Sequence, residues 1–233
     1  MVLKIEEATV GQRSCKDWHR LRKRRIGASH AGWVLNCFRR KTCPPSLMKT
    51  LRGEYDFSPI TAVKWGLKNE AKAIEACEKD KNIKTKPSGA WVSDQYSFLI
   101  ASPDGIIEPG FLNIDRCTVH EGGGRVNSIN GKQAKGILEI KCLYKFRNAT
   151  IAEAIDGSGA GFHLNKDGLL NTWHNYYAQI QLGMHFSHSA YCLFVTHTNA
   201  ETKYEIVYYN ETWIRENLHK LVDFYNDVFI PSL

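Results

Sequence analysis

The chain has 233 residues, of which 43% are hydrophobic and 24% are charged. This composition is typical of a globular protein and excludes disorder of the whole chain, and the length allows one elaborated domain or two small ones. The 31 Lys and Arg residues exceed the 24 Asp and Glu residues, so the formal net charge is +7 and an anionic partner is expected.

Membrane insertion and secretion are not expected. No apolar run reaches the ~18 residues that a transmembrane helix needs. The first dozen residues contain Glu6 and Glu7 and lack the apolar stretch of a signal peptide. The 7 cysteines are scattered without a Cys-x-x-Cys pair, which favours reduced thiols. We therefore expect an intracellular protein, in the cytoplasm or nucleus of a host cell, with no membrane partner.

Positive charge is concentrated near the start of the chain. Helices are predicted over residues 14–25 and 29–36, and basic runs extend from His19 to Arg25 and from Arg39 to Lys41. Such clusters attract nucleic acid, because each neutralised phosphate releases counterions. A solvated helix face or a localisation signal has a similar composition, so both alternatives stay open.

A further helix, predicted over residues 64–80, places an acid among apolar residues. Leu67, Glu70, Ile74 and Cys77 fall on one face at helical spacing. A carboxylate on a buried face requires a partner. A structural salt bridge, or a helix whose buried face is phased differently, would explain this position as well as a functional site would.

Three strands are predicted next, over residues 90–93, 97–101 and 104–108, and Asp104 lies where the last of them begins. The Pro-Asp-Gly sequence around it suits a tight turn, so on its own Asp104 is a turn residue. Residues 110–136, with three consecutive glycines, are predicted to be a long loop or insertion.

The strand predicted over residues 137–142 is strongly alternating. Glu139 and Lys141 point to one face, and Leu138, Ile140 and Cys142 point to the other. An exposed ion pair on a half-buried strand is the ordinary explanation of such a pattern.

The rest of the chain is predicted to contain a helix over residues 171–186, strands over 190–197 and 204–209, and a helix over 210–228. Strands in the middle with helices before, between and after them indicate a sheet covered by helices. The histidines at positions 174, 185, 188 and 197 lack the spaced Cys or acidic partners of a tetrahedral metal site, so structural roles are expected for them.

Together, Glu70, Asp104 and the Glu139-x-Lys141 pair predict a metal-dependent nuclease site. Carboxylates ~4 Å apart repel by about 4 kcal/mol per pair at an effective dielectric of 20, so a cluster of them needs a cation. Oxygen ligands and a phosphate substrate favour Mg²⁺, with Mn²⁺ as a substitute. A metal held by the three acids and the Ile140 carbonyl would acidify a water, and Lys141 could orient that water or stabilise developing charge.

At these residues the chain resembles the lambda-exonuclease-like, YqaJ-type viral recombinases of the PD-(D/E)xK nuclease superfamily. The matching blocks are Trp18 to Arg22, Ile26 to Ser29, Trp65 to Glu70, Ser102 to Gly105, Leu138 to Cys142, and Tyr176 to Gln181. The resemblance implies a single α/β (α+β) nuclease domain over residues 1–233, with a central mixed β-sheet flanked by helices. It also implies 5′→3′ digestion of one strand of linear double-stranded DNA, leaving 3′ single-stranded DNA for recombination or repair.

The resemblance assigns roles to individual residues. It implies Asp104 and Glu139 as metal ligands, Lys141 as the catalytic amine and Glu70 as the residue that completes the site. It implies that the 5′-terminal phosphate is held by Arg22, Ser29 and Gln179. The chemistry agrees, because Arg binds phosphate bidentately and Ser29 would cap a helix that starts near His30.

The chain departs from the family pattern at two places. The interval of 35 positions between Asp104 and Glu139 exceeds a compact hairpin, which is why an insertion is predicted, and Leu143 stands where relatives often have proline. The alternatives are a restriction- or resolvase-type endonuclease and a non-catalytic DNA-binding or annealing protein. Relatives often form ring-shaped trimers, so a homotrimer and a single-strand annealing partner are further expectations.

Overall fold

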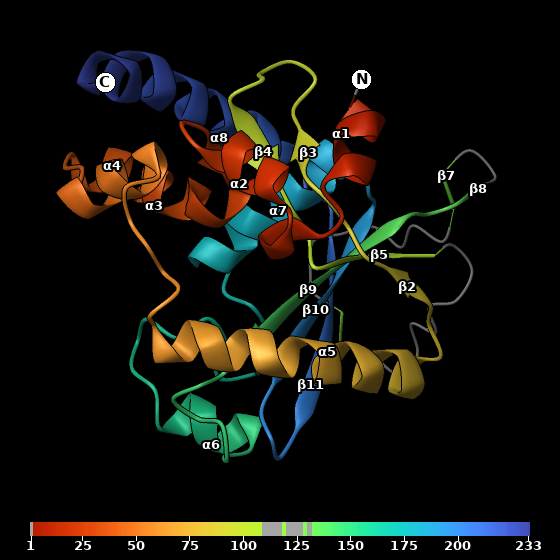
Figure 1. Ribbon diagram of the computed structural model, residues 1–233. Coiled ribbons are helices and arrows are strands. Elements are labelled where there is room, and N and C mark those ends of the chain that lie inside the picture. The colour runs from red at the N-terminus through yellow and green to blue at the C-terminus, as the bar shows by residue number, and fades with distance from the viewer. Residues whose placement is uncertain (1, 109–117, 120–127, 130–131) are drawn as a thin grey trace.

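The computed structural model describes residues 2–108, 118–119, 128–129 and 132–233, and its largest sheet has six strands (Figure 1). In spatial order these are β2 (Thr85–Lys86), β5 (Gly105–Ile107), β9 (Gly136–Cys142), β10 (Tyr191–His197), β11 (Thr202–Tyr208) and β6 (Thr118–Val119). β9 and β10 are parallel, whereas β5 and β11 pair antiparallel with them. The predicted mixed sheet flanked by helices is confirmed.

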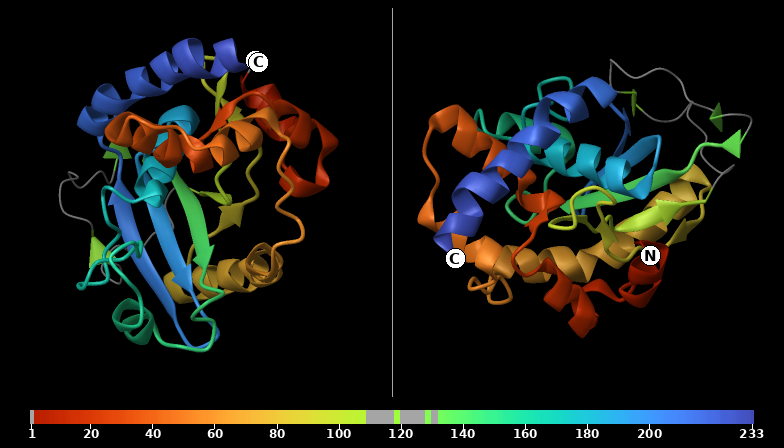
Figure 2. Two further views of the ribbon diagram at one scale, coloured as in Figure 1. Left: turned by 90° about the vertical axis from the view of Figure 1, so that its left-hand side faces the viewer. Right: turned by 90° about the horizontal axis from the view of Figure 1, so that it is seen from above.

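Different helices cover the two faces of this sheet (Figure 2). α5 (Thr61–Lys81) packs into one apolar cluster with Leu138, and α7 (Asn175–Ser187) packs into another with Ile137. Adjacent strand residues point to opposite faces, so the odd-numbered residues of β9, Glu139 among them, lie on the side of α7. The predicted alternation of this strand is therefore present in the structure.

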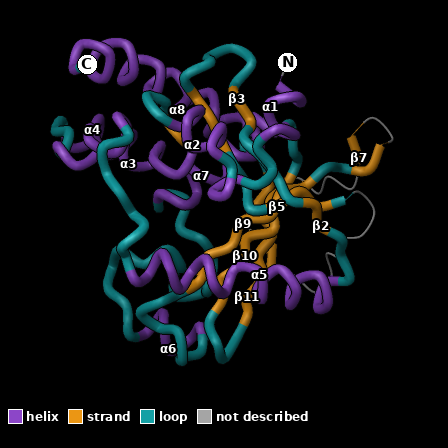
Figure 3. The backbone as a smooth tube through the Cα atoms, viewed as in Figure 1, coloured by secondary structure: helices purple, strands orange, loops and turns teal. Residues whose placement is uncertain are grey.

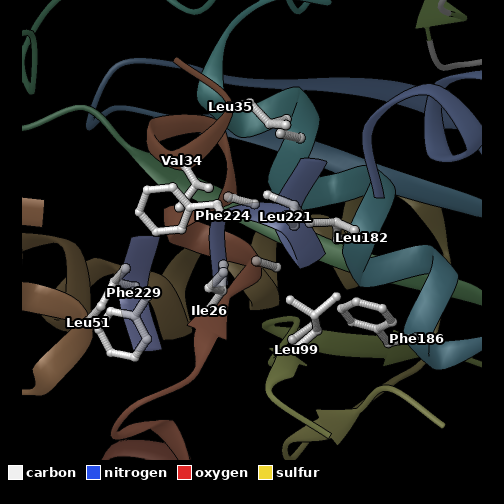
Figure 4. Packing of buried hydrophobic residues seen from close by; sticks show 14 of the residues in the cluster. Ile26, Val34, Leu35, Leu51, Leu99, Leu182, Phe186, Leu221, Phe224 and Phe229 are labelled. Carbon is white, nitrogen blue, oxygen red and sulfur yellow. The ribbon is translucent and has the colours of Figure 1, made fainter. Parts of the chain in front are cut away.

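A second layer of helices packs against α7 and encloses an apolar core. It consists of α3 (Ala28–Arg40), α4 (Pro45–Arg52) and α8 (Glu211–Phe224). The buried core residues include Ile26, Val34, Leu35, Leu51, Leu99, Leu182, Phe186, Leu221, Phe224 and Phe229 (Figure 4). Gly32 lets α3 and α7 approach closely, because a Cβ atom there would lie 2.6 Å from the Cα of Asn175.

A small second sheet contacts both α3 and α7. Its order is β1 (Ile26–Gly27), β4 (Leu99–Ala101) and β3 (Trp91–Val92), with β1 parallel to β4. β1 leads directly into α3, and β4 leads into the turn before β5. The start of α3 and the turn that contains Asp104 are thus held by neighbouring strands.

The start of the chain is fastened to the same region. The amide of Gln12 donates to the carbonyl oxygens of Ser88 and Pro103, each at 2.8 Å, and the Thr9 hydroxyl accepts a 2.8 Å bond from the N–H of Ala90. Gln12 has a φ of 41°, which is uncommon for a residue other than glycine. The elements here are α1 (Val2–Ala8), the 3-10 helix η1 (Gln12–Ser14) and α2 (Lys16–Arg22).

Three helices were not predicted from the sequence: α1, α4 and α6 (Ile151–Asp156). α4 begins at Pro45, whose fixed φ suits a first turn, and α6 begins with a capping box between Thr150 and Glu153.

At the other end of the chain, α8 continues into a π-helical turn, η3 (Tyr225–Phe229), and a 3-10 turn, η4 (Ile230–Ser232). None of the helices among the described residues is both long and apolar enough to cross a membrane.

The insertion predicted over residues 110–136 lies mostly outside the described residues. Its described part contains β6, the hairpin of β7 (Ser128–Ile129) and β8 (Lys132–Gln133), and the first residue of β9. The local sequence pattern did not predict these short strands, and the interpretation of residues 110–136 as a long loop or insertion stays a prediction.

Candidate active site

A pocket of about 350 Å³ lies beside β9, next to Gly105, the first residue of β5. Gly105 of β5 pairs with Leu138, so the ladder on this side of β9 stops just before Glu139. The pocket is lined by all eight residues predicted for the site: Arg22, Ser29, Glu70, Asp104, Glu139, Ile140, Lys141 and Gln179. They come from α2, α3, α5, α7, β9 and the turn before β5.

Asp104 forms two hydrogen bonds to the backbone of β9, just beyond the last strand pair. Its N–H donates to the carbonyl oxygen of Leu138 at 3.0 Å, and its Oδ2 accepts from the N–H of Ile140 at 2.7 Å. Burial raises the pKa of Asp104, and the charge of Lys141 opposes this shift. Because the N–H and C=O of one strand residue point to the same side, the Ile140 carbonyl also faces this edge.

Glu139 and Lys141 form a buried ion pair, not the exposed pair that the pattern alone allows. Glu139 is 3% exposed, and Lys141 Nζ donates to its Oε1 at 2.6 Å. Gln179 Nε2 donates to the same oxygen. Burial raises the pKa of Glu139 to about 8, and the negative charge of Asp104 adds to this shift. Burial lowers the pKa of Lys141, but Glu139 and other neighbours outweigh it, so the pKa lies above its ordinary value and the amine stays protonated.

Glu70 lies beside the buried face of α5 and not within it. The buried residues of this helix are Asn69, Ala73, Cys77 and Lys81. Leu67 is 43% exposed, so the predicted placement of Leu67 and Glu70 on the packed face was wrong. The reason is that the early turns of α5 wall the pocket, where both residues are found. Burial raises the pKa of Glu70 to about 7, and the charge of Asp104 contributes to this shift.

Arg22 and Ser29 lie together in the same pocket, at the N-terminus of α3. Arg22 Nη2 donates to Ser29 Oγ at 3.1 Å, and the guanidinium lies over the Trp18 ring, 4.5 Å from its centroid. Burial lowers the pKa of Arg22 to about 10, and the charge of Arg13 adds to this shift. The prediction that Ser29 caps α3 was wrong. Gly27 is the N-cap, because the helix begins at Ala28 and places Ser29 inside the first turn.

Three further residues of the pocket were not predicted to function there: Arg13, Trp18 and Tyr176. The Trp18 indole donates to Ser102 Oγ at 2.9 Å, and Lys141 Nζ lies 4.5 Å from the centroid of the Tyr176 ring. Both aromatic residues fall within the matching sequence blocks, which was the available signal. Arg13 falls outside these blocks. It reaches the pocket through the position of η1, which the local sequence does not predict.

The chemistry of the pocket fits a hard divalent cation. Glu70, Asp104 and Glu139 supply carboxylate oxygens, and the pKa of each is raised, so a nearby dication would stabilise the charged forms. Within the described part of the chain, no group of three or more His, Cys, Asp or Glu side chains is arranged to hold a metal ion. In this arrangement Glu139 is bonded to Lys141 and Gln179 instead.

The four histidines considered in the sequence each contact a different neighbour. His174 caps α7 by accepting from the N–H of Tyr176. The other three contacts are those of His185 with the Tyr209 hydroxyl, His188 with Asp94, and His197 with the Thr202 hydroxyl. These contacts give each ring a local structural partner.

The mixed sheet, its flanking helices and the acidic edge of β9 define the class of the protein. The fold is that of the lambda-exonuclease-like PD-(D/E)xK nucleases. The model of the YqaJ-like viral recombinase domain matches residues 17–190, and the chain belongs to this family. Comparison with curated protein sequences gives no match.

Solved structures with a similar fold include the alkaline exonuclease LHK-Exo from Laribacter hongkongensis. The TM-score is 0.61 at 16% sequence identity, and the alignment covers 93% of each chain. The Shutoff and Exonuclease Protein (SOX) from Kaposi's sarcoma-associated herpesvirus aligns with a TM-score of 0.56 at 12% identity, covering 96% of this chain and 71% of that one. A SOX–DNA complex aligns with a TM-score of 0.59 at 12% identity, covering 98% and 72%.

Proposed function

We propose that the protein is a Mg²⁺-dependent 5′→3′ exonuclease that digests one strand of linear double-stranded DNA and leaves 3′ single-stranded DNA for recombination or repair. The observation that carries this proposal is the meeting of Glu70, Asp104, Glu139 and Lys141 in one pocket that also contains Arg22. Membership of the YqaJ-like recombinase family supports a nuclease acting on DNA. Two proteins with a similar fold, LHK-Exo and SOX, are exonucleases, and SOX has been solved in complex with DNA and with RNA, which is consistent with a nucleic-acid substrate.

The residues of the pocket divide into three groups by role, two of which act on the DNA itself. Arg22, Ser29 and Gln179 bind the 5′-terminal phosphate, for which a buried guanidinium and a helix N-terminus are suited. Lys141, kept protonated by its acidic neighbours, stabilises negative charge that develops on the phosphate undergoing cleavage.

Asp104, Glu139, Glu70 and the Ile140 carbonyl are the groups that would hold Mg²⁺ or Mn²⁺. When bound, such a cation supplies an acidified water and neutralises charge on the phosphate. Lys141 and Gln179 both donate to Oε1 of Glu139, and a cation held by this carboxylate would compete with them for that oxygen.

The decisive experiment compares end-labelled linear duplex with covalently closed circular duplex, in Mg²⁺ and with a chelator. We expect loss of the linear DNA from its 5′ end, survival of the circle, and no digestion without metal. Lys141→Ala and Glu139→Gln should each slow digestion by roughly 100-fold or more, whereas Lys79→Ala, an exposed control on α5, should not. Full turnover by both pocket variants would reject the assignment of the site.

The same assay separates the alternatives. An endonuclease of restriction or resolvase type would cut the circle. A non-catalytic DNA-binding or annealing protein would bind both DNAs but leave them undigested in Mg²⁺ and in Mn²⁺. The proposal extends to an intracellular location, a homotrimer and a single-strand annealing partner. Sedimentation and co-purification with the annealing protein test the last two.

A further inference from the structure

A second pocket, of about 370 Å³, lies where α3, the start of α7 and α8 meet. Figure 3 shows these helices grouped beside the strands of the central sheet. The walls combine aromatic rings with cationic side chains, and the main contributors are Phe38, Arg39, Trp173, Trp213 and Lys220. None of the described residues that line it is an Asp or Glu. The pocket therefore has the surface chemistry of a site for an aromatic anion.

Two of the aromatic residues of this pocket are exposed. Trp173 is 60% exposed and Phe38 is 40% exposed, and Trp33, on the same helix as Phe38, is 41% exposed. Large aromatic side chains grouped on a surface mark a site of interaction, because each leaves apolar area in water. The volume lies within the range of small-molecule pockets and is sufficient for a nucleobase.

The second pocket adjoins the candidate active site through α3 and α7. Along α7, Ala178 lines the second pocket and the next residue, Gln179, lines the first. The ring of His174, in the second pocket, packs edge-on against the ring of Tyr176, in the first, at a centroid distance of 4.6 Å. The two pockets therefore share α3 and α7 as walls and are neighbours in the structure.

We propose that the second pocket binds unpaired bases of single-stranded DNA, namely the strand that digestion leaves intact. Trp173 and Phe38 stack on the bases, and Arg39 and Lys220 bind the phosphates. The combination of stacking rings and cations without acidic residues is typical of single-strand binding sites and disfavours a cationic peptide. The identity of the strand rests on the proposed function, because Arg22 and its neighbours would already hold the end of the digested strand.

The test measures DNA binding in EDTA, so it does not depend on turnover. Wild type, Trp173→Ala and Trp173→Phe are titrated with a blunt duplex and with duplexes that carry overhangs of about 10 nucleotides at either the 3′ or the 5′ end. The 3′ overhang should strengthen binding by wild type, and Trp173→Ala should weaken binding of this DNA by about 5- to 100-fold. Trp173→Phe should restore part of the loss, and blunt-duplex affinity should stay within about twofold.

Tyr55→Ala is the matched control, because Tyr55 is a 46% exposed aromatic residue outside this pocket. Unchanged affinity of Trp173→Ala for the 3′ overhang, or equal losses on all three DNAs, would overturn the proposal. An equal loss on the 5′ overhang would overturn the choice of strand. A changed sedimentation coefficient with unaltered DNA affinity would identify the pocket as an interface between copies of the chain and likewise overturn it. Binding as predicted together with inactivity in Mg²⁺ would reject the nuclease function and leave the single-strand site standing.

Discussion

At the scale of single residues, the pocket places groups of opposite charge in a buried setting. Glu139 is stabilised by Lys141, and Arg22 lies in the same pocket near the additional charge of Arg13. A buried ion pair contributes little net stability, because desolvation of both charges offsets their attraction. These residues are therefore better explained by binding and chemistry than by folding.

Arg22 is the residue that we propose to bind the 5′-terminal phosphate. On that proposal Arg22→Ala should reduce digestion of 5′-phosphorylated ends more than digestion of 5′-hydroxyl ends, because other cations contribute to general affinity for DNA. The loss on the phosphorylated end should be roughly 10-fold or more, the magnitude of a charge-assisted hydrogen bond. The effect is measured by comparing the rates at which wild type and Arg22→Ala digest 5′-phosphorylated and 5′-hydroxyl duplexes.

Arg20→Ala is the control, because Arg20 lies on the same helix with 81% of its side chain exposed. It should weaken both rates alike. Equal losses on the two ends in Arg22→Ala would contradict a role for Arg22 in end recognition.

At the scale of elements, the contact between α3 and α7 sets the geometry of both pockets. Residues of these two helices line the candidate active site and the second pocket. Gly32 permits their close approach, and the N-terminus of α3 and Gln179 of α7 converge as a result. The spacing of the two helices is therefore a requirement for the site as well as for the core.

Gly32→Ala should destabilise the fold. A helix interior favours Ala over Gly by about 1 kcal/mol, but the new Cβ would lie 2.6 Å from a backbone atom of Asn175, and such overpacking costs about 1–3 kcal/mol. Urea denaturation should show a lower free energy of unfolding. Gly66→Ala on α5 meets no atom within 4 Å and should gain up to about 1 kcal/mol. Stabilisation by both changes would show that the helices can separate freely.

The elements also show what the sequence could and could not predict. The alternation of Leu138, Glu139 and Ile140 placed the acid on the correct face, because a strand has one strict period. The helical period is equally regular, but it does not reveal that the early turns of α5 line a pocket, so the face that carries Glu70 was misjudged. Arg13 was missed because its position depends on contacts of Gln12 with residues far along the chain.

At the scale of the whole molecule, buried histidines couple stability to pH. His163 is 3% exposed, and burial lowers its pKa from 6.5 to about 3, with the charge of His174 contributing. The unfolded chain therefore binds a proton at a higher pH than the folded chain does. The stability is fully present above pH 6.5 and is lost as the pH falls towards 3, at about 1.4 kcal/mol per pH unit from this residue.

His163→Gln should reduce that dependence. Urea denaturation at pH 7.5 and about pH 5.5 should show a smaller difference in the free energy of unfolding for this variant than for wild type, by about 1 kcal/mol. His219→Gln, at an exposed position on α8, should behave like wild type. Identical pH dependence in His163→Gln and wild type would mean that the ring is protonated within the folded protein.

The attachment of the first dozen residues has a practical consequence for handling the protein. Gln12, in its left-handed conformation, joins this segment to the carbonyl of Pro103, next to Asp104. Proteolytic loss of this segment would therefore disturb an acidic ligand candidate from a distance. A preparation clipped near Thr9 should be suspected whenever specific activity varies between batches.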